Sequence, residues 1–200
     1  MCAKISHSYE YGYTAGKLAA DWLNTNCSAS QTVACALLTK PQSLAVIDRA
    51  NGIIEGLREN CTFAQIVATK PYSDQASVRE MTEQMTREHP KIRCIVGVSD
   101  MSILGAYDAL EAMNLLNEEM CLVGIDASAP VLKKIQEGTV IRGSVSQDTK
   151  GFAEVTIHAA IAAIQGNPLP ESSIKIEAVT MENVAAYLQA EAASHSTPAS

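Results

Sequence analysis

The chain has 200 residues, of which 47% are hydrophobic and 18% are charged, and its formal net charge is −7 at pH 7. This composition supplies enough apolar side chains for the core of one large domain, or of one and a half small ones, and it excludes disorder over most of the chain. Lys and Arg form no cluster, which argues against a protein that binds nucleic acid or an anionic membrane. No apolar run approaches the length of about 18 residues that a transmembrane helix requires, so we expect no membrane insertion.

Apolar periodicity predicts helices and strands that alternate along the chain. The predicted helices cover residues 9–26, 42–59, 74–88, 101–114, 129–136, 149–165 and 182–193. The predicted strands cover residues 31–39, 63–69, 92–98, 120–125, 140–147 and 174–179. Ser73 is expected to cap the third helix, and Gly138 and Gly166 are expected to end the fifth and the sixth.

The predicted strands are apolar throughout, which is typical of strands that are buried on both faces of a sheet. Such strands, alternating with helices, predict a three-layer α/β fold in which a mostly parallel sheet lies between two layers of helices. The small and polar tail, residues 194–200, is expected to be frayed.

The six cysteines are positioned in a way that argues against a disulfide framework. Cys35, Cys94 and Cys121 lie within predicted strands, where a thiol is usually a small buried apolar group. The other three lie near the ends of predicted elements, where we expect more exposure: Cys2, Cys27 and Cys61. No Cys or His pair has the spacing of a zinc site, and we expect no metal or other cofactor.

Two consecutive predicted strands end on polar side chains, Asp126 and Gln147. In an open parallel sheet, small molecules bind beyond the carboxyl ends of the strands, because loops and helix N-termini there present unpaired donors. The placement of Asp126 and Gln147 therefore predicts a site for a polar ligand.

The motifs of common enzyme classes are absent from the sequence. It lacks the G-x-S-x-G nucleophile elbow, the phosphate-binding P-loop and the glycine fingerprint of a dinucleotide site. The four histidines are scattered singly along the chain. These observations favour a binding protein over an enzyme.

Five short motifs follow one another in an order that is informative as a set. They are Gly12–Lys17, Asp48–Leu57, Ser99–Ala106, Val123–Asp126 and Gly143–Asp148. Together they resemble the type I periplasmic sugar-binding proteins of ABC importers, with the galactose- and ribose-binding branch as the nearest match. The resemblance extends over most of the chain and implies a protein of two similar α/β lobes joined by three hinge strands.

The resemblance also implies how the chain is divided. Residues 1–8 correspond to the first hinge crossing, and residues 9–147 to the C-terminal sugar-binding lobe. Residues 148–170 correspond to a helix of the N-terminal lobe. Nearly all of the rest of that lobe is expected to be absent. Residues 171–193 return to the C-terminal lobe, and the tail 194–200 is expected to be flexible.

By the same resemblance, this chain carries half of a sugar site. Arg49 lies where the family places an arginine whose fixed donors suit neighbouring sugar hydroxyls. Asp126 lies where a carboxylate accepts from two hydroxyls. Gln147 lies at the second hinge crossing and Ser6 at the first.

Three further candidates follow strand ends. Asp100 matches the family, but Ser99 departs from it, because the sugar-binding members usually carry Asn before this Asp. An amide donor is therefore lost, and the identity of the sugar is left undetermined. Tyr72 follows the strand end at Lys70 and Pro71, where it either forms a pocket wall or packs within its loop.

Each main assignment has a structural alternative. Arg49 is then a surface residue paired with Asp48 or Glu55, since surface ion pairs are common. Asp126 is then the N-cap of the following helix, and Gln147–Asp148 simply begins the next one.

The resemblance implies the solute-binding component of a carbohydrate ABC transporter, with a monosaccharide or polyol as ligand and the membrane permease as partner. The alternatives are the effector-binding domain of a LacI-type repressor, or a fragment that binds nothing. A repressor would carry a helix-turn-helix before this domain, and the sequence shows none. The family is periplasmic, but no signal peptide is evident at the start of this sequence, so cytoplasmic residence of the chain as given is also open.

Two geometric expectations follow. Arg49, Ser99, Asp126 and Gln147 should lie at one edge of a single sheet, with side chains that converge on a common cleft. The apolar face of helix 149–165 should either fold back on its own lobe or be covered by a second chain, which would make a homo-oligomer.

Overall fold

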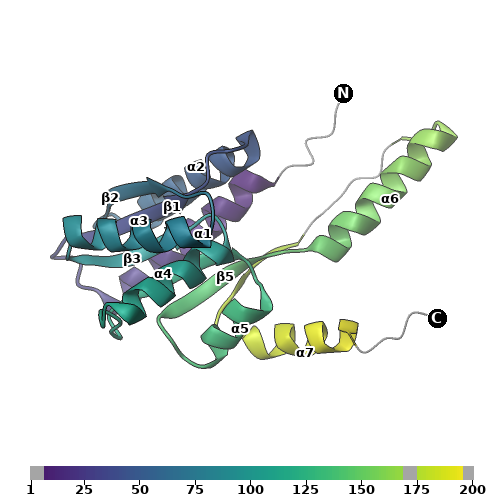
Figure 1. The fold of residues 1–200 in the computed structure, drawn as a ribbon. Helices are drawn as coiled ribbons and strands as arrows, with labels where there is room; N and C mark the ends of the chain where they lie inside the picture. The colour runs from purple at the N-terminus through teal and green to yellow at the C-terminus, as the bar shows by residue number, and fades with distance from the viewer. Residues whose placement is uncertain (1–6, 169–174, 196–200) are drawn as a thin grey trace.

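The computed structural model describes residues 7–168 and 175–195. Its helices are α1 (Ser8–Asn26), α2 (Leu44–Asn60), α3 (Gln75–Glu88), α4 (Asp100–Ala112), α5 (Ala129–Gln136), α6 (Thr149–Gln165) and α7 (Val184–His195). Its strands are β1 (Val33–Thr39), β2 (Ala64–Pro71), β3 (Ile92–Gly97), β4 (Cys121–Asp126), β5 (Ile141–Gln147) and β6 (Ile176–Val179). Helices and strands alternate along the chain, as the periodicity predicts (Figure 1).

The strands form one sheet in the order β2-β1-β3-β4-β5-β6. The first five are parallel to one another, and β6 pairs antiparallel with β5. The side chains of β1, β3 and β4 are almost all buried, because helices cover both faces of the sheet. The predicted α/β class and mostly parallel sheet are confirmed.

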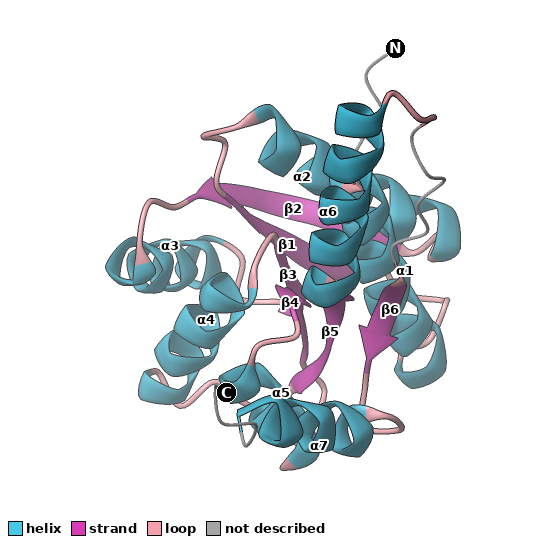
Figure 2. Ribbon diagram, turned by 90° about the vertical axis from the view of Figure 1, so that its right-hand side faces the viewer, coloured by secondary structure: helices cyan, strands magenta, loops and turns pink. Residues whose placement is uncertain are grey.

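Apart from α6, the helices form one layer on each face of the sheet (Figure 2). α1 and α2 pack together on one face, while α3, α4 and α5 cover the other and α7 packs against α5. The core between the layers includes Leu37, Ile95, Ile103 and Leu122, each of which is fully or almost fully buried. The burial of these apolar side chains and of the rest of the core supplies the main stabilising free energy of the fold.

The two helices α1 and α2 approach each other closely enough to exclude any side chain at the contact. A Cβ added to Gly16 would lie 2.2 Å from the carbonyl oxygen of Ile53, and one added to Gly52 would lie 2.2 Å from that of Tyr9. Both distances are far shorter than van der Waals contact, so these positions require glycine. The close contact fixes α2, and with it the side chains that α2 carries to the edge of the sheet.

Several local expectations are corrected by the structure. Asp74, not Ser73, is the N-cap of α3, because its carboxylate accepts the amide of Ser77 in a reciprocal capping box. Cys61, expected near the surface, is 2% exposed, because at the C-terminal end of α2 it belongs to the hydrophobic core. α7 continues to His195, beyond the end that was predicted for this helix at residue 193.

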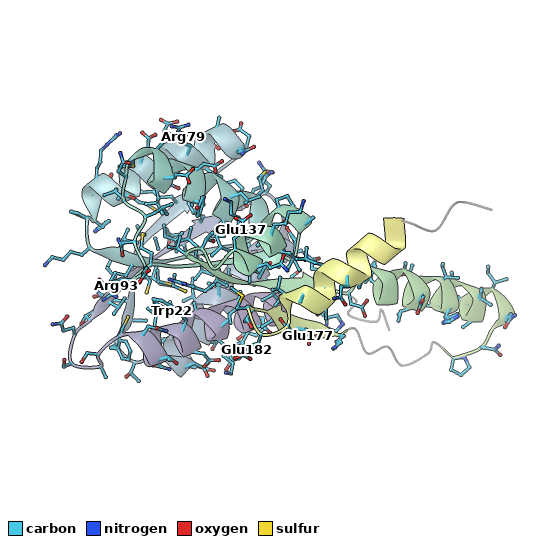
Figure 3. All side chains as sticks on the ribbon, turned by 90° about the horizontal axis from the view of Figure 1, so that it is seen from below. Trp22, Arg79, Arg93, Glu137, Glu177 and Glu182 are labelled. Atoms are coloured by element: carbon cyan, nitrogen blue, oxygen red, sulfur yellow. The ribbon has the colours of Figure 1, made fainter. Side chains whose placement is uncertain are left out.

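Helix α6 stands away from the rest of the molecule, and both Figure 1 and Figure 3 show it reaching beyond the other helices. Its apolar side chains are exposed, with Ile157 at 57%, Ile161 at 46% and Ile164 at 87%. Of the two outcomes expected for this helix, folding back on its own lobe is therefore wrong, and cover by a second chain stays a prediction. Its helical end is as predicted, since Gly166 closes it with a left-handed backbone at φ 70°.

Within the described residues, no helix combines the length and the hydropathy needed to cross a bilayer.

Candidate functional site at the carboxyl edge of the sheet

The strand order creates a natural binding position at the carboxyl edge of the sheet. Chain order reverses between β1 and β3, because the connection after β1 leads outward to β2 while the connection after β3 leads to β4 on the other side. The helices that follow these two strands, α2 and α4, consequently lie on opposite faces of the sheet. In open parallel sheets this arrangement leaves a crevice between the first turns of the two helices. Arg49 lies on α2, and Ser99 and Asp100 begin α4.

Arg49 bridges this crevice. Its Nη1 donates to the carbonyl oxygen of Val98 at 2.8 Å and lies 3.8 Å from Oδ1 of Asp126. The guanidinium also lies over the ring of Tyr11, 5.9 Å from its centroid. Only 14% of the Arg49 side chain is exposed, so the alternative of a surface ion pair with Asp48 or Glu55 is wrong.

One donor of Arg49 has no partner in the described part of the chain. Its Nε is buried and has no hydrogen bond to any described residue. An unsatisfied buried donor costs about 1–3 kcal/mol, so such a group calls for an explanation.

Asp126 ends β4 in an unusual backbone conformation. Its φ is 128°, and that of Ala127 is 49°, both in the range that favours glycine. Each such residue costs on the order of 1–3 kcal/mol and persists only where its surroundings hold it. The strain turns the chain sharply at the strand end; the N-cap of α5 is Ser128, so the alternative that Asp126 caps this helix is wrong.

The carboxylate of Asp126 lies among donors from three elements. Nε2 of Gln147, at the end of β5, donates to Oδ1, and the Arg49 guanidinium is close to the same oxygen. Burial raises the pKa of the Asp126 carboxyl, while the Arg49 charge, the backbone amide of Asp100 and the Gln147 amide oppose that rise. The Asp126 side chain is still 39% exposed, so it can meet a ligand from solvent.

Asp148 behaves as its structural alternative predicts. Its carboxylate accepts the amide of Gly151 at 2.8 Å and so caps α6. Gln147, one residue earlier, faces Asp126 instead. The end of β5 therefore serves both the helix and the candidate site.

Ser99 and Tyr72 form a second pair at the edge. Their hydroxyls lie 2.8 Å apart, and Ser99 also caps α4 by accepting the amide of Ser102. Tyr72 is 4% exposed, so it supports the crevice from within and does not form an open wall. Ser6 lies outside the described residues.

Asp100 differs from expectation, because it is 2% exposed and faces the interior. Its Oδ2 accepts the amide of Ser128 at 2.6 Å and the hydroxyl of the same residue at 2.7 Å, and its Oδ1 accepts the hydroxyl of Ser144 at 2.6 Å. Burial raises the pKa of Asp100 to about 6, against the opposing effect of these hydrogen bonds. Direct contact between this carboxylate and a ligand is inconsistent with its burial.

The structure thus brings Arg49, Asp126 and Gln147 together and places Ser99 at the same edge of the sheet. Sequence reasoning missed Ser128 and Ser144, which bind the Asp100 carboxylate. One signal was present, since Ser144 occupies an inward position of a strand, where a polar side chain requires a partner.

A cavity of about 530 Å³ lies at the opposite edge of the sheet, beside Cys27 and Arg93. Arg93 and Glu119, which both line it, pair with each other at 3.4 Å. Figure 3 shows Arg93 at the far end of the molecule from α6, whereas the candidate site lies where β5 leads into α6. None of the predicted site residues among those described lines this cavity.

A family model described as a periplasmic binding protein domain matches residues 6–168. The chain belongs to this family. The resemblance inferred from its motifs is therefore confirmed, and the six-stranded α/β lobe is the fold of a periplasmic binding protein. No match was found among curated proteins.

Solved structures agree with this assignment. An ABC transporter solute-binding protein from Bacillus halodurans C-125 with bound myo-inositol superposes with a TM-score of 0.78 and 27% identity, over 91% of this chain and 61% of that one. A periplasmic solute-binding protein from Actinobacillus succinogenes 130z with bound D-allose gives a TM-score of 0.79 and 19% identity, over 90% and 62%. A Mycobacterium smegmatis protein in complex with β-D-fucofuranose gives 0.80 and 23%, over 94% and 62%. This periplasmic binding protein domain thus spans less than two thirds of the length of these neighbours.

Proposed function

We propose that this chain binds a monosaccharide or cyclic polyol at the carboxyl edge of its sheet, as part of the solute-binding component of a carbohydrate ABC transporter. The observation that carries the proposal is the meeting of Arg49, Asp126 and Gln147 at one point, from α2, β4 and β5. Family membership supports the same substrate class, as do the allose, inositol and fucofuranose named for the structural neighbours.

The chemistry of the three side chains suits adjacent hydroxyl groups. A sugar hydroxyl both donates and accepts, so a pair of vicinal hydroxyls can donate to the Asp126 carboxylate and accept from Arg49. At 3.8 Å, the distance from Arg49 Nη1 to Asp126 Oδ1 is longer than a charge-assisted hydrogen bond, so the two groups do not saturate each other.

The site is half of a clamshell in this proposal. We propose that residues 9–147 and 171–193 form one lobe and that residues 1–8 and 148–170 lead to a second lobe, which supplies the other contacts with the ligand. Closure of two lobes around a ligand excludes water and changes the shape of the protein, which a permease on the periplasmic face of the membrane can recognise. The exposed apolar face of α6 supports this division, since it is suited to packing against that second lobe.

Calorimetric titration of the chain with D-allose, myo-inositol and D-fucose tests the proposal. A single open lobe keeps about half of the polar contacts, so we expect millimolar or weaker affinity for at least one of them, equivalent to about 4 kcal/mol or less. Asp126→Ala should weaken that affinity by at least about tenfold, because it leaves the ligand hydroxyls without their acceptor.

Asp108→Ala is the matched control, since it removes an exposed carboxylate from the outer face of α4. It should leave the affinity unchanged. Micromolar binding that survives Asp126→Ala would show that both the half-site and the role of Asp126 are wrong.

A further inference from the structure

The strained turn at the end of β4 is held by a closed set of hydrogen bonds. The amide of Ala127 donates to Oγ of Ser144 at 2.9 Å, and Ser144 Oγ donates to Oδ1 of Asp100 at 2.6 Å. The amide and hydroxyl of Ser128 both donate to Oδ2 of Asp100. The two residues that follow Asp126 are therefore tied, directly or through Ser144, to one buried carboxylate.

Two features of the surrounding structure are arranged around that carboxylate. Ser128 is the N-cap residue of α5, yet its hydroxyl makes no capping bond and donates to Asp100 instead. Gly124 of β4 leaves the space that Asp100 fills, since an added Cβ would lie 2.2 Å from Oδ1. Ser128, a residue type that normally caps its own helix, binds Asp100 instead. Gly124 has no side chain and leaves room for the Asp100 carboxylate.

The left-handed turn controls where the Asp126 side chain points. Successive side chains of an extended strand point to opposite faces of the sheet, so a regular backbone would direct the Asp126 side chain to one of these faces. The positive φ of Asp126 and Ala127 replaces that direction with one toward Arg49 and Gln147. Such a backbone persists only where neighbouring groups hold it.

We propose that Asp100 is a positioning residue for the ligand site: through Ser128 and Ser144 it holds the turn that aims the Asp126 carboxylate at the ligand. The inference rests on the proposed function, because Asp126 is the ligand acceptor there. It assigns Asp100 no contact with ligand, in keeping with its burial.

The first test measures the turn without any ligand, by amide hydrogen exchange in the intact chain. Asp100→Ala should accelerate exchange at Ala127 and Ser128 by at least about tenfold, because the acceptor of this hydrogen-bond set is lost. Asp100→Asn should restore most of the protection, since its amide oxygen can still accept from Ser128. Thr82→Ala is the control, because it removes a buried hydroxyl on α3 and should leave both amides unchanged.

If Asp100→Ala does not fold, Ser144→Ala decides the same question. It deletes one hydroxyl and should accelerate exchange at Ala127. Unchanged exchange at Ala127 and Ser128 in the variant that folds would overturn the inference.

The second test asks whether Asp100 acts through Asp126, by NMR titration with myo-inositol. Asp100→Ala should weaken binding by about tenfold in the otherwise unchanged chain and by less than about twofold when Asp126 is already alanine, which is the signature of coupled residues. Equal losses in both backgrounds would overturn the claim that Asp100 acts through Asp126. If Asp126→Ala alone leaves myo-inositol binding intact, the proposed function fails, and the exchange data still decide whether Asp100 holds the turn.

Discussion

At the scale of single residues, the two carboxylates at the end of β4 and the start of α4 serve different purposes because their surroundings differ. Asp126 is partly exposed and faces a cation and an amide, so it suits a ligand that donates hydrogen bonds. Asp100 is buried and accepts three hydrogen bonds from serines, so it suits a structural tie. Because both residues are aspartates, the difference in burial separates the two roles.

The buried carboxyl predicts a pH dependence of stability. Because the pKa of Asp100 rises from 3.8 to about 6 on folding, the folded state binds the proton more tightly than the unfolded state. Stability therefore falls as pH rises from about 4 to about 6, by on the order of 3 kcal/mol from this group. We expect the Asp100→Asn variant to lack this pH-dependent contribution. The difference between its free energy of unfolding and that of the unmodified chain should therefore increase in favour of the variant as the pH rises across this range.

Denaturant titrations of both proteins from about pH 4 to about pH 7 measure the difference, since this range contains the expected loss of stability. Comparing the two proteins cancels the titrating groups that do not interact with Asp100, whereas the nearby charge of Asp126 contributes to the raised pKa of Asp100 and belongs to the measured difference. Two stability curves that run parallel over this range would contradict the assignment of a raised pKa to Asp100.

At the scale of elements, the close contact of α1 with α2 determines where α2 places its side chains at the carboxyl edge of the sheet. Gly16 and Gly52 let the two backbones meet, and α2 carries Arg49 to the crevice from this fixed position. The geometry of the candidate site therefore depends on residues that lie far from any ligand.

Gly16→Ala should destabilise the chain by about 1–3 kcal/mol, because the new methyl group would overlap the carbonyl of Ile53 and push the helices apart. Thermal or urea unfolding measures the loss. Thr14→Ala, on the same helix but outside this contact, should change the free energy of unfolding by less than about 0.5 kcal/mol. Similar losses in the two variants would argue against the steric explanation.

At the scale of the whole molecule, one region has no partner within the described chain. α6 leaves the body after β5, and the chain returns along β6, which pairs antiparallel with β5. The helix exposes Phe152, Ile157, Ile161 and Ile164 in place of the core contacts that such side chains normally make. We propose that in the isolated chain a second copy covers this surface.

Light scattering of the isolated chain should then show a mass that increases with concentration, since exposed apolar helices associate to remove area from water. Ile157→Glu should return the chain to a monomer. Met181→Glu is the control, because Met181 is also exposed, at 53%, but lies between β6 and α7, beside Gly138. A chain that is monomeric at all concentrations, with α6 freely exchanging its amides, would contradict the proposal.

The sequence by itself determined the α/β class, the family and the edge of the sheet at which the candidate site lies. These features depend on local patterns: apolar runs with helices between them, glycines such as Gly138 and Gly166 at helix ends, and polar residues at the ends of strands. Because all carboxyl ends of parallel strands meet at one edge, the sequence pattern alone predicts that Asp126 and Gln147 share that edge.

Only the tertiary structure decided which of these residues face one another and which are buried. Arg49 pairs across the crevice instead of with its neighbours on α2, Asp100 turns inward to Ser128 and Ser144, and α6 stands free. The left-handed backbone of Asp126 was equally invisible, since nothing in the residue type requires it. These outcomes depend on burial and on contacts between segments distant in sequence, and local propensity carries no information about either.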